Sequence, residues 1–181
     1  MKDREEIVQQ KIREKEFVEA IQLEGARLNF WKILTEDKGY SPEDIEVDPE
    51  FDLGLPNCES KVSIDFILTI SQVSYMAVKC SPSSMESWER YSIAFARSVK
   101  EYQIPYATVT DGENARIFDT LTATCIAESL DSLFSRVEAE NIVKNLAKTP
   151  CPEKRLEKEK RIVYAFEGIK CPTEKQSPEP R

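Results

Sequence analysis

Apolar residues recur at helical spacing near the start of the chain. Over residues 17–36 they fall every three or four positions, which predicts a helix with one buried face. The recurring residues are Phe17, Val18, Ile21, Leu28, Trp31 and Leu34. Residues 3–16 are highly charged with few apolar positions, which predicts a helix with only a narrow apolar stripe. Gly39 and Pro42 suit the end of this helix.

From residue 45 onward the hydrophobic period shortens to two, which indicates β-strands. Residues 45–47 and 51–53 predict a short edge strand, because Pro49 between them cannot donate to a sheet. Residues 61–70 and 74–80 predict two longer strands that are neighbours in the chain.

Alternation along these two longer strands assigns their side chains to faces of the sheet. In the first strand the two sets are Ile64, Phe66 and Leu68 against Ser63, Asp65 and Ile67. In the second strand they are Met76 and Val78 against Tyr75, Ala77 and Lys79. We therefore expect Asp65 and Lys79 to lie on the same side of the sheet.

The rest of the chain alternates between helical and strand patterns. Residues 84–103 predict a helix, and residues 106–110 and 115–118 predict two strands joined by a tight turn. A strand, helix and strand in succession predict a crossover and a parallel strand pair. Residues 127–147 and 153–170 predict two further helices.

This order of elements predicts a mixed α/β domain. We expect a charged helical extension at residues 1–16 and the domain itself at residues 17–147. A C-terminal helical extension would follow at residues 148–170, and a disordered tail at residues 171–181.

Length and composition fit a single soluble domain. The chain has 181 residues, of which 40% are hydrophobic and 32% charged. It contains no apolar run of about 18 residues, the length that a membrane span needs. The first residues contain no apolar stretch of the kind found in a secretory signal. We therefore expect a cytoplasmic location.

The net charge of −8 argues against strong non-specific binding to nucleic acid. The charge is uneven, however. Residues 41–60 hold seven acids and no base, whereas residues 144–175 hold nine bases and five acids. A local basic surface therefore stays open as an alternative.

The chain has five cysteines and no histidine. The cysteine count is odd and no two cysteines are close in sequence, which excludes the usual zinc spacings and a disulfide framework. The absence of histidine excludes Ser-His-Asp and Cys-His catalysis. We expect free, reduced and structural thiols.

The ordered segments SIDFIL, YMAVKC, RYSIAFAR and IPYATVTDGENARIFD resemble a known family. They are similar to the N-terminal nuclease-type domain of type I restriction enzyme R subunits, within the restriction-endonuclease-like PD-(D/E)xK superfamily. The resemblance covers roughly residues 17–135 and rests on the ordered set, because no single motif in it is specific. It implies an α/β fold with a mixed sheet flanked by helices.

The resemblance also implies a metal site. In this family an aspartate on one strand, and an acid plus a lysine on the next, bind a divalent cation and position a water for DNA phosphodiester cleavage. Asp65 matches the metal-binding aspartate and Lys79 matches the lysine, which supplies positive charge. Glu24 matches an accessory metal-binding acid from the first helix. Mg²⁺ or Mn²⁺ would be the cofactor.

Two departures from the family pattern lower the expectation of catalysis. Ala77 stands where the acid two residues before the lysine belongs. Tyr91 and Phe95 replace two polar positions of the following helix. In some related nucleases that helix supplies the acid, which makes Glu86 and Glu89 the candidates here. At 100° per residue, both point well away from the side that carries Tyr91.

Three hypotheses remain open from the sequence. The first is a divalent-metal-dependent endonuclease with a degenerate site. The second is an inactive module of the same fold that serves protein assembly or weak nucleic-acid binding. The third is an unrelated α/β interaction domain, in which Asp65 and Lys79 would lie far apart.

The partners follow from these hypotheses. DNA, a second copy of the chain, or a separate restriction or helicase protein are the candidate partners, and no membrane is expected. The chain has no Gly-x-x-x-x-Gly-Lys-Ser/Thr loop, so we expect no ATP-driven translocation by this chain alone.

Overall fold

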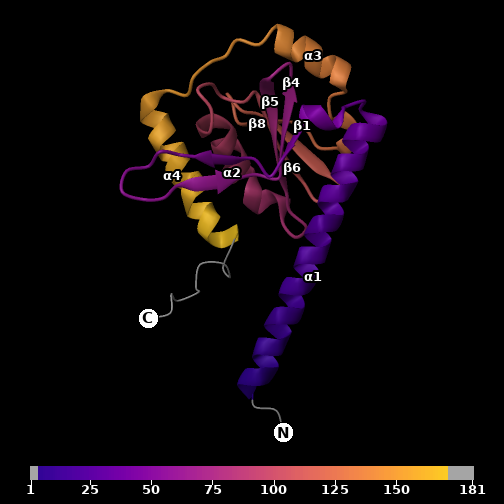
Figure 1. The fold of residues 1–181 in the computed structure, drawn as a ribbon, viewed down its shortest axis with the longest axis vertical. Coiled ribbons are helices and arrows are strands. Elements are labelled where there is room, and N and C mark those ends of the chain that lie inside the picture. Colours follow the sequence, from indigo (N-terminus) through magenta and orange to yellow (C-terminus); the bar gives the residue numbers. More distant parts are fainter. Residues whose placement is uncertain (1–3, 171–181) are drawn as a thin grey trace.

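The computed structural model describes residues 4–170, with side chains to residue 167, as a mixed α/β body from which one long helix projects (Figure 1). The tail expected at residues 171–181 lies outside the described residues, and so do the first three residues of the expected N-terminal extension. No helix in residues 4–170 combines the length and the apolar character that crossing a membrane requires. The cysteines of the described part are free, as expected: Cys58, Cys80, Cys125 and Cys151.

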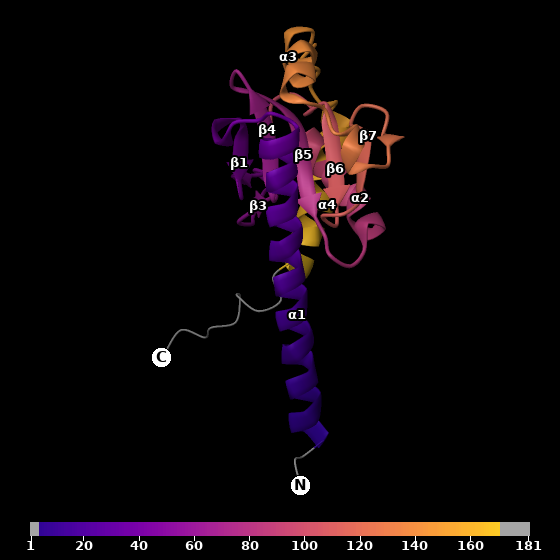
Figure 2. The ribbon, with the colours of Figure 1, turned by 90° about the vertical axis from the view of Figure 1, so that its right-hand side faces the viewer.

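The N-terminal helix confirms the helical pattern of the first residues. Helix α1 (Arg4–Lys32) is continuous and passes into a π-helical turn (Ile33–Asp37). The chain then turns at Gly39, whose φ of +78° is accessible to glycine at little cost. Only the last part of α1 packs on the body, and its first part stands clear of it (Figures 1 and 2).

Six strands form the main sheet, in the spatial order β1-β4-β5-β6-β7-β8. Their bounds are β1 (Ile45–Val47), β4 (Phe66–Ile70), β5 (Val73–Cys80), β6 (Tyr106–Thr110), β7 (Ala115–Asp119) and β8 (Thr124–Ala127). All neighbours are antiparallel except β5 and β6, which helix α2 (Met85–Ser98) connects as a parallel pair. The mixed sheet flanked by helices and the crossover are both confirmed.

The sheet separates two hydrophobic cores. On one side α1 and α3 (Arg136–Lys144) cover a cluster that includes Phe30, Leu34 and Met76. On the other side α2 and α4 (Glu153–Lys170) cover a cluster that includes Tyr91 and Phe95. Figure 2 shows α1 and α4 on opposite faces of the sheet.

The strand expected at residues 61–70 is two strands with a break. Strand β3 (Lys61–Ser63) pairs with β2 (Glu50–Asp52) in a separate two-stranded sheet, and the chain bends at Asp65 before β4 begins. The break resets the alternation, so Ile64 packs in the cluster of Tyr91 and not on the face of Phe66. The prediction that Ile64 and Phe66 lie on one face of the sheet is therefore wrong.

The prediction of one helix over residues 127–147 is also wrong for the first half of this range. Strand β8 takes residues up to Ala127, and a short 3₁₀ turn (Leu130–Ser132) follows. Helix α3 begins only after Ser135, whose hydroxyl accepts from the Glu138 backbone N–H in a reciprocal capping box. Residues 127–135 are compatible with a helix in their sequence, but they form the end of a strand, a short turn and the N-cap of α3.

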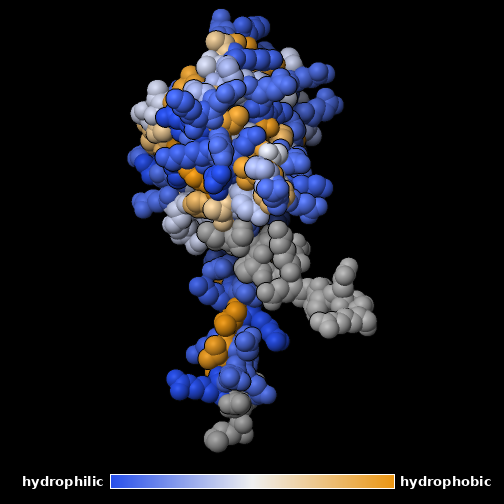
Figure 3. Space-filling model, turned by 90° about the vertical axis from the view of Figure 1, so that its left-hand side faces the viewer, coloured by the Kyte–Doolittle hydropathy of each residue, from blue (hydrophilic) through white to orange (hydrophobic). Residues whose placement is uncertain are grey.

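The helix expected from the charged run at residues 153–170 is confirmed as α4. It packs along α2 and buries Val163, together with the carboxylate of Glu159. The division of the chain into a domain at residues 17–147 and two extensions stays a prediction. Most of the surface is hydrophilic, but hydrophobic atoms are visible on the projecting part of α1 (Figure 3).

Candidate functional site

Asp65 and Lys79 meet at one end of the strand pair β4 and β5. Because Phe66 pairs with Val78 in the antiparallel register, the next residues along each strand are brought opposite each other. Lys79 Nζ lies 2.9 Å from Asp65 Oδ2, and the Cys80 backbone N–H donates to the same oxygen at 2.7 Å. Asp65 is only 5% exposed and Lys79 8%. This convergence argues against the hypothesis that the two residues are unrelated.

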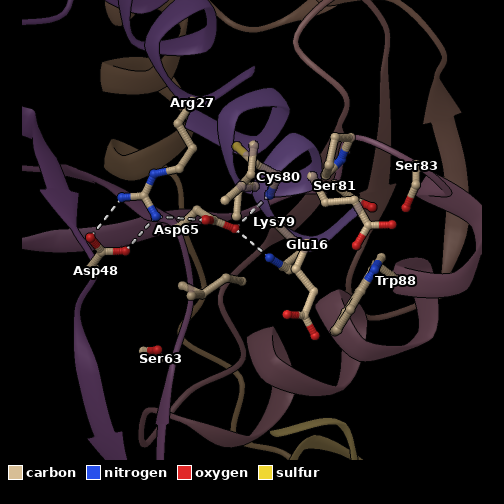
Figure 4. A pocket seen from close by; sticks show the side chains of 15 residues that line it. Glu16, Arg27, Asp48, Ser63, Asp65, Lys79, Cys80, Ser81, Ser83 and Trp88 are labelled. Carbon is tan, nitrogen blue, oxygen red and sulfur yellow. Dashed lines mark hydrogen bonds and ion pairs between the residues drawn. The ribbon is translucent and has the colours of Figure 1, made fainter. Parts of the chain in front are cut away.

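A third charged residue, Arg27 of α1, completes the environment of Asp65. Its guanidinium Nη1 donates to Asp65 Oδ1 at 3.0 Å. The same group forms a two-pronged pair with Asp48, with Nη1–Oδ1 at 2.8 Å and Nη2–Oδ2 at 2.7 Å. Figure 4 shows Arg27 between the two carboxylates. Both oxygens of Asp65 therefore accept from cationic side chains.

The carboxylates hold Arg27 firmly in its charged form. The hydrogen bond to Asp48, followed by the charges of Asp65 and Glu24, raises the pKa of Arg27 above its ordinary value, although burial acts in the opposite direction. The Arg27 guanidinium also lies over the Phe66 ring, with Cζ 5.4 Å from the centroid. Arg27 is thus a fixed part of the site.

Local structure explains how Asp48 reaches this position. It comes directly after β1, whose Val47 pairs with Phe66, so Asp48 lies opposite Asp65. Its backbone N–H donates to the Asp65 carbonyl oxygen at 3.0 Å. Its φ of +48° is left-handed, a conformation that aspartate tolerates better than most residues. The turn therefore directs two aspartates toward one guanidinium.

A cavity of about 540 Å³ opens beside these residues, between α1 and the strand ends (Figure 4). Asp65, Lys79, Arg27 and Asp48 all line it, and α1 adds a turn-spaced face. The lining residues on that face are Glu16, Glu19, Ala20 and Leu23. Trp88 of α2 forms part of the wall, and its ring lies 5.1 Å from Lys79 Nζ. The cavity lining holds more carboxylates than cations.

The structure does not bring Glu24 to this cavity. Its side chain is 77% exposed, and its nearest described contact is with Arg27 Nε at 3.8 Å. One residue earlier, Leu23 faces the cavity, so Glu24 is turned by about 100° from that face. The acids of α1 that do line the cavity are Glu16 and Glu19.

Position 77, where the family pattern has an acid, does not line the cavity, and neither do Glu86 and Glu89, the two candidate replacements. Ala77 is fully buried in the cluster of Tyr91, beneath the site. Glu86 is exposed, and Glu89 forms an ion pair with Arg116 on β7. Position 77 is therefore part of the hydrophobic core.

Tyr91 also has a structural role beneath the site. Its hydroxyl oxygen lies 2.8 Å from the Ser63 carbonyl oxygen and 3.1 Å from Glu167 Oε1, and these two acceptors share its one proton. Burial, followed by the negative charge of Glu167, raises the pKa of Tyr91, which keeps the hydroxyl protonated as a donor. The tyrosine thereby connects β3 with α4.

The residues present do not fit the divalent cation that the resemblance implies. Such a cation needs carboxylate oxygens with free lone pairs. Both oxygens of Asp65 already accept from Arg27, Lys79 or Cys80, and Ala77 contributes no oxygen. In the described part of the chain, no group of three or more Asp, Glu, Cys or His side chains is arranged to hold a metal ion.

Sequence reasoning missed Arg27 and Asp48, the two residues that change the chemistry of the site. A signal for them exists in the chain. A carboxylate buried on a strand must be neutralised, and Arg27 lies one helical turn beyond Glu24. Asp48 directly follows the strand at residues 45–47.

Comparison with known proteins agrees with this architecture. The family model described as "Type I restriction enzyme R protein N terminus (HSDR_N)" matches residues 23–133, which include Arg27, Asp48, Asp65 and Lys79. No curated protein and no solved structure matches the chain. The matched segment spans more than half of the chain, from the packed part of α1 to the turn before α3. The chain therefore belongs to the family of type I restriction enzyme R protein N-terminal domains.

Proposed function

We propose that this chain is a restriction-enzyme R-type domain that does not cleave DNA and that acts as an assembly module. The observation that carries the proposal is the position of Arg27. Its guanidinium occupies the space between Asp48 and Asp65, at 2.7–3.0 Å from their oxygens. The buried carboxylate of Asp65 is thus neutralised by side chains of the protein itself.

A guanidinium cannot replace the chemistry of a divalent cation. It offers N–H donors only, stays protonated, and has no vacant coordination position for a water or a phosphate oxygen. A metal lowers the pKa of a bound water and stabilises charge on the phosphate, and neither effect is available from Arg27. The pairing of Arg27 with the two aspartates therefore stabilises the fold and offers no means of hydrolysing a phosphodiester.

The projecting helix supports the assembly role. Every residue from Arg4 to Gln22 is exposed, and these include large apolar side chains. Phe17, Val18 and Ile21 lie next to one another on one side of the helix, and an exposed apolar patch is typical of an interaction site. The family to which the chain belongs is named for a subunit of a restriction enzyme, so the partner we propose is a protein chain of such a system.

Plasmid nicking in the presence of Mg²⁺ or Mn²⁺ tests the proposal. We expect the unmodified protein to cleave no faster than Asp65→Ala or Lys79→Ala. We also expect neither cation to raise the melting temperature, whereas a cation at 100 times its Kd would stabilise the fold by about 2.7 kcal/mol. Metal-dependent nicking that both substitutions abolish would overturn the proposal.

That overturning result would instead establish the second candidate function, which is divalent-metal-dependent DNA cleavage. One observation favours it. Asp65 and Lys79, 2.9 Å apart, line a cavity of about 540 Å³ whose wall also carries Glu16 and Glu19. Cleavage would require Arg27 to leave Asp65 when DNA and metal bind. Arg27→Ala would then increase the cleavage rate, whereas under the first proposal it leaves the protein inactive.

A further inference from the structure

The cavity beside Asp65 contains two carboxylates that the charge pairs described above do not use. Its two cations, Arg27 and Lys79, are paired with the two aspartates of the lining. The other acids of the lining are Glu16 and Glu19, which lie one helical turn apart on α1. No ion pair of Glu16 is found within residues 4–167, and the pair of Glu19 with Lys15, at 3.7 Å, joins two exposed side chains. Both glutamates can therefore pair with a cation from another molecule.

The cavity lining also has apolar parts that suit the stem of a long side chain. Leu23 of α1, Ile64 and Trp88 contribute to it. Figure 4 shows Glu16 and Trp88 among the side chains that surround the cavity. Its volume of about 540 Å³ falls in the range of small-molecule pockets, so one long side chain fits inside. A basic side chain combines an apolar stem with a charged head, and the lining offers a partner for each part.

The two cations that the chain itself places in the cavity show how a cation is held there. Lys79 Nζ contacts the Asp65 carboxylate and lies 5.1 Å from the centre of the Trp88 ring. The Arg27 guanidinium spans two carboxylates and lies 5.4 Å from the centre of the Phe66 ring. Each cation thus has both carboxylate and aromatic partners. A guanidinium suits the two glutamates for the same reason, because its planar fork can bridge two carboxylates.

The charge of the cavity lining argues against other classes of ligand. Four carboxylates against two cations leave it with a net charge of −2, which repels an anion such as phosphate. A divalent metal ion is also disfavoured, because no group of three or more acids in the described part of the chain is arranged to hold one. An organic cation is the class of ligand that fits both the charge and the apolar wall.

The same side of α1 continues beyond the cavity with exposed apolar residues. Ile12 lies one turn before Glu16 and Val8 one turn earlier, and each step of four residues turns the helix axis by only about 40°. Ile12 is 45% exposed and Val8 is 50% exposed. A small free cation in the cavity would leave both residues in water. A chain segment that carries the cation can cover them as well, so a protein partner fits this side of the helix better.

We infer that the cavity receives an arginine side chain of a partner protein, on a segment that also places an apolar residue against Ile12. The guanidinium pairs with Glu16 and Glu19, and the stem of the arginine lies on the apolar wall beside Trp88. The inference rests on the assembly role proposed above and specifies how the partner is recognised.

Titration of the ¹⁵N-labelled full chain with a synthetic peptide tests the inference. The probe is a capped heptapeptide with one central arginine, a leucine at each end and alanine elsewhere. A second probe carries citrulline, which has the shape of arginine without its charge. The chain has two tryptophans, so two indole N–H signals are followed. Trp88 packs against the cluster of Tyr91, whereas Trp31 packs against the cluster on the other side of the sheet.

We expect the arginine peptide to shift the indole signal of Trp88 and to leave that of Trp31 unchanged. We expect the citrulline peptide to bind about tenfold more weakly or worse, because it loses the charge of its hydrogen bonds to the glutamates.

Helix α1 offers a matched pair of charge variants. Glu16→Gln/Glu19→Gln removes the two carboxylates of the cavity and should weaken binding of the arginine peptide by about tenfold. Glu6→Gln/Glu14→Gln removes the same charge from two exposed positions of the same helix that do not line the cavity. Because salt screens distant surface charges, we expect this control to weaken binding by less than about twofold.

Two isoleucines of α1 test whether the occupant is a chain segment. Ile12 and Ile21 are 45% and 57% exposed, and nine residues of helix place them on opposite sides of α1. We expect Ile12→Ser to weaken binding by about threefold, because an apolar contact with the leucine of the peptide is lost. We expect Ile21→Ser to leave binding unchanged.

Three results would overturn the arginine site: no shift of the Trp88 signal at about 10 mM peptide, equal binding of the two peptides, or equal weakening by the two glutamine pairs. Equal effects of the two isoleucine substitutions would assign the cavity to a free organic cation and would overturn the chain segment. The titration is independent of the nicking assay. A protein that neither cleaves DNA nor binds the peptide would refute the arginine site alone, and nicking by a protein that binds the peptide would refute the absence of cleavage alone.

Discussion

At the scale of single residues, the site is defined by how Asp65 is neutralised. A carboxylate that is 5% exposed loses most of its hydration, and burial of an unpaired charge is costly. Lys79, Arg27 and the Cys80 N–H together replace that hydration. The arrangement explains how the fold can keep a buried aspartate at this position with groups of the protein alone.

The first prediction concerns the loss of one of these partners. Arg27→Met removes one charged hydrogen bond from Asp65 and both from Asp48, which is exposed and regains water. Because Lys79 remains, we expect a loss of about 2 kcal/mol in the free energy of unfolding, the size of one hydrogen bond to a charged group. Urea denaturation in the presence of EDTA measures the loss without interference from metal ions.

Arg161→Met provides the control for this substitution. Arg161 pairs with Glu157 on the surface of α4, and its side chain is 69% exposed. Such surface pairs contribute about 0.5 kcal/mol or less. Equal effects of the two substitutions would show that Arg27 has no special role. In the double variant Arg27→Met/Asp65→Asn we expect a further loss of stability, because the Lys79 ammonium, 8% exposed, is then buried without its carboxylate partner.

At the scale of elements, the contact between α2 and α4 raises the question of where the domain ends. Glu159 of α4 is 1% exposed and accepts from Arg97 of α2 at 3.0 Å. Arg97 is itself 5% exposed and also donates to the Thr120 carbonyl oxygen at 2.9 Å. A helix that was only an extension would not be expected to bury a charge pair against the body. The contact therefore favours α4 as part of the folding unit.

The second prediction tests this contact. Arg97→Met leaves the Glu159 carboxylate buried with one strong partner fewer, and breaking a buried pair costs about 3–5 kcal/mol. Thermal and urea unfolding should both show the loss as a single transition. Arg155→Met is the matched control, because Arg155 approaches the same carboxylate at 4.0 Å but is 51% exposed. If the two variants were equally stable, α4 would be an independent extension.

Strong periodic patterns were sufficient to predict several elements. The sequence pattern located α1, the crossover through α2, and α4 within its charged run. It also located Asp65 and Lys79 on one side of the sheet, because Met76 and Val78 alternate with Ala77 and Lys79 at this end of β5. The expected face of Tyr75 is wrong, because Tyr75 packs in the same cluster as Met76. These features depend on residues that are close in sequence.

The features that the sequence did not predict depend on contacts between distant segments. The break at Asp65 arises where β3 leaves the main sheet to pair with β2. The strand at Thr124–Ala127 forms because β7 offers an edge. Arg27 and Asp48 meet Asp65 from a helix and from another strand, 38 and 17 residues away in the chain. The periodicity of hydrophobic residues within one segment does not indicate which distant segment will contact it.

At the scale of the whole molecule, the charge distribution bears on DNA as a partner. The chain has a net charge of −8, and the cavity beside Asp65 adds Glu16, Glu19 and Asp48 to the same surface. DNA binding draws its affinity from lysine and arginine that displace counterions from phosphates. The two cations at the site, Arg27 and Lys79, are already paired with carboxylates. The negative potential of the cavity therefore opposes an approaching phosphate backbone.

The third prediction is that the domain binds duplex DNA very weakly. Fluorescence anisotropy with a labelled duplex should give a dissociation constant above about 100 μM at physiological salt, the weak end of non-specific binding. We expect Glu16→Lys/Glu19→Lys to bind more tightly at low salt and to show a steeper salt dependence, because two carboxylates of the cavity become cations. Micromolar binding by the unmodified chain, with a steep salt dependence, would mean that a basic surface elsewhere on the molecule overcomes its net charge. DNA would then replace protein assembly as the first interaction to explain.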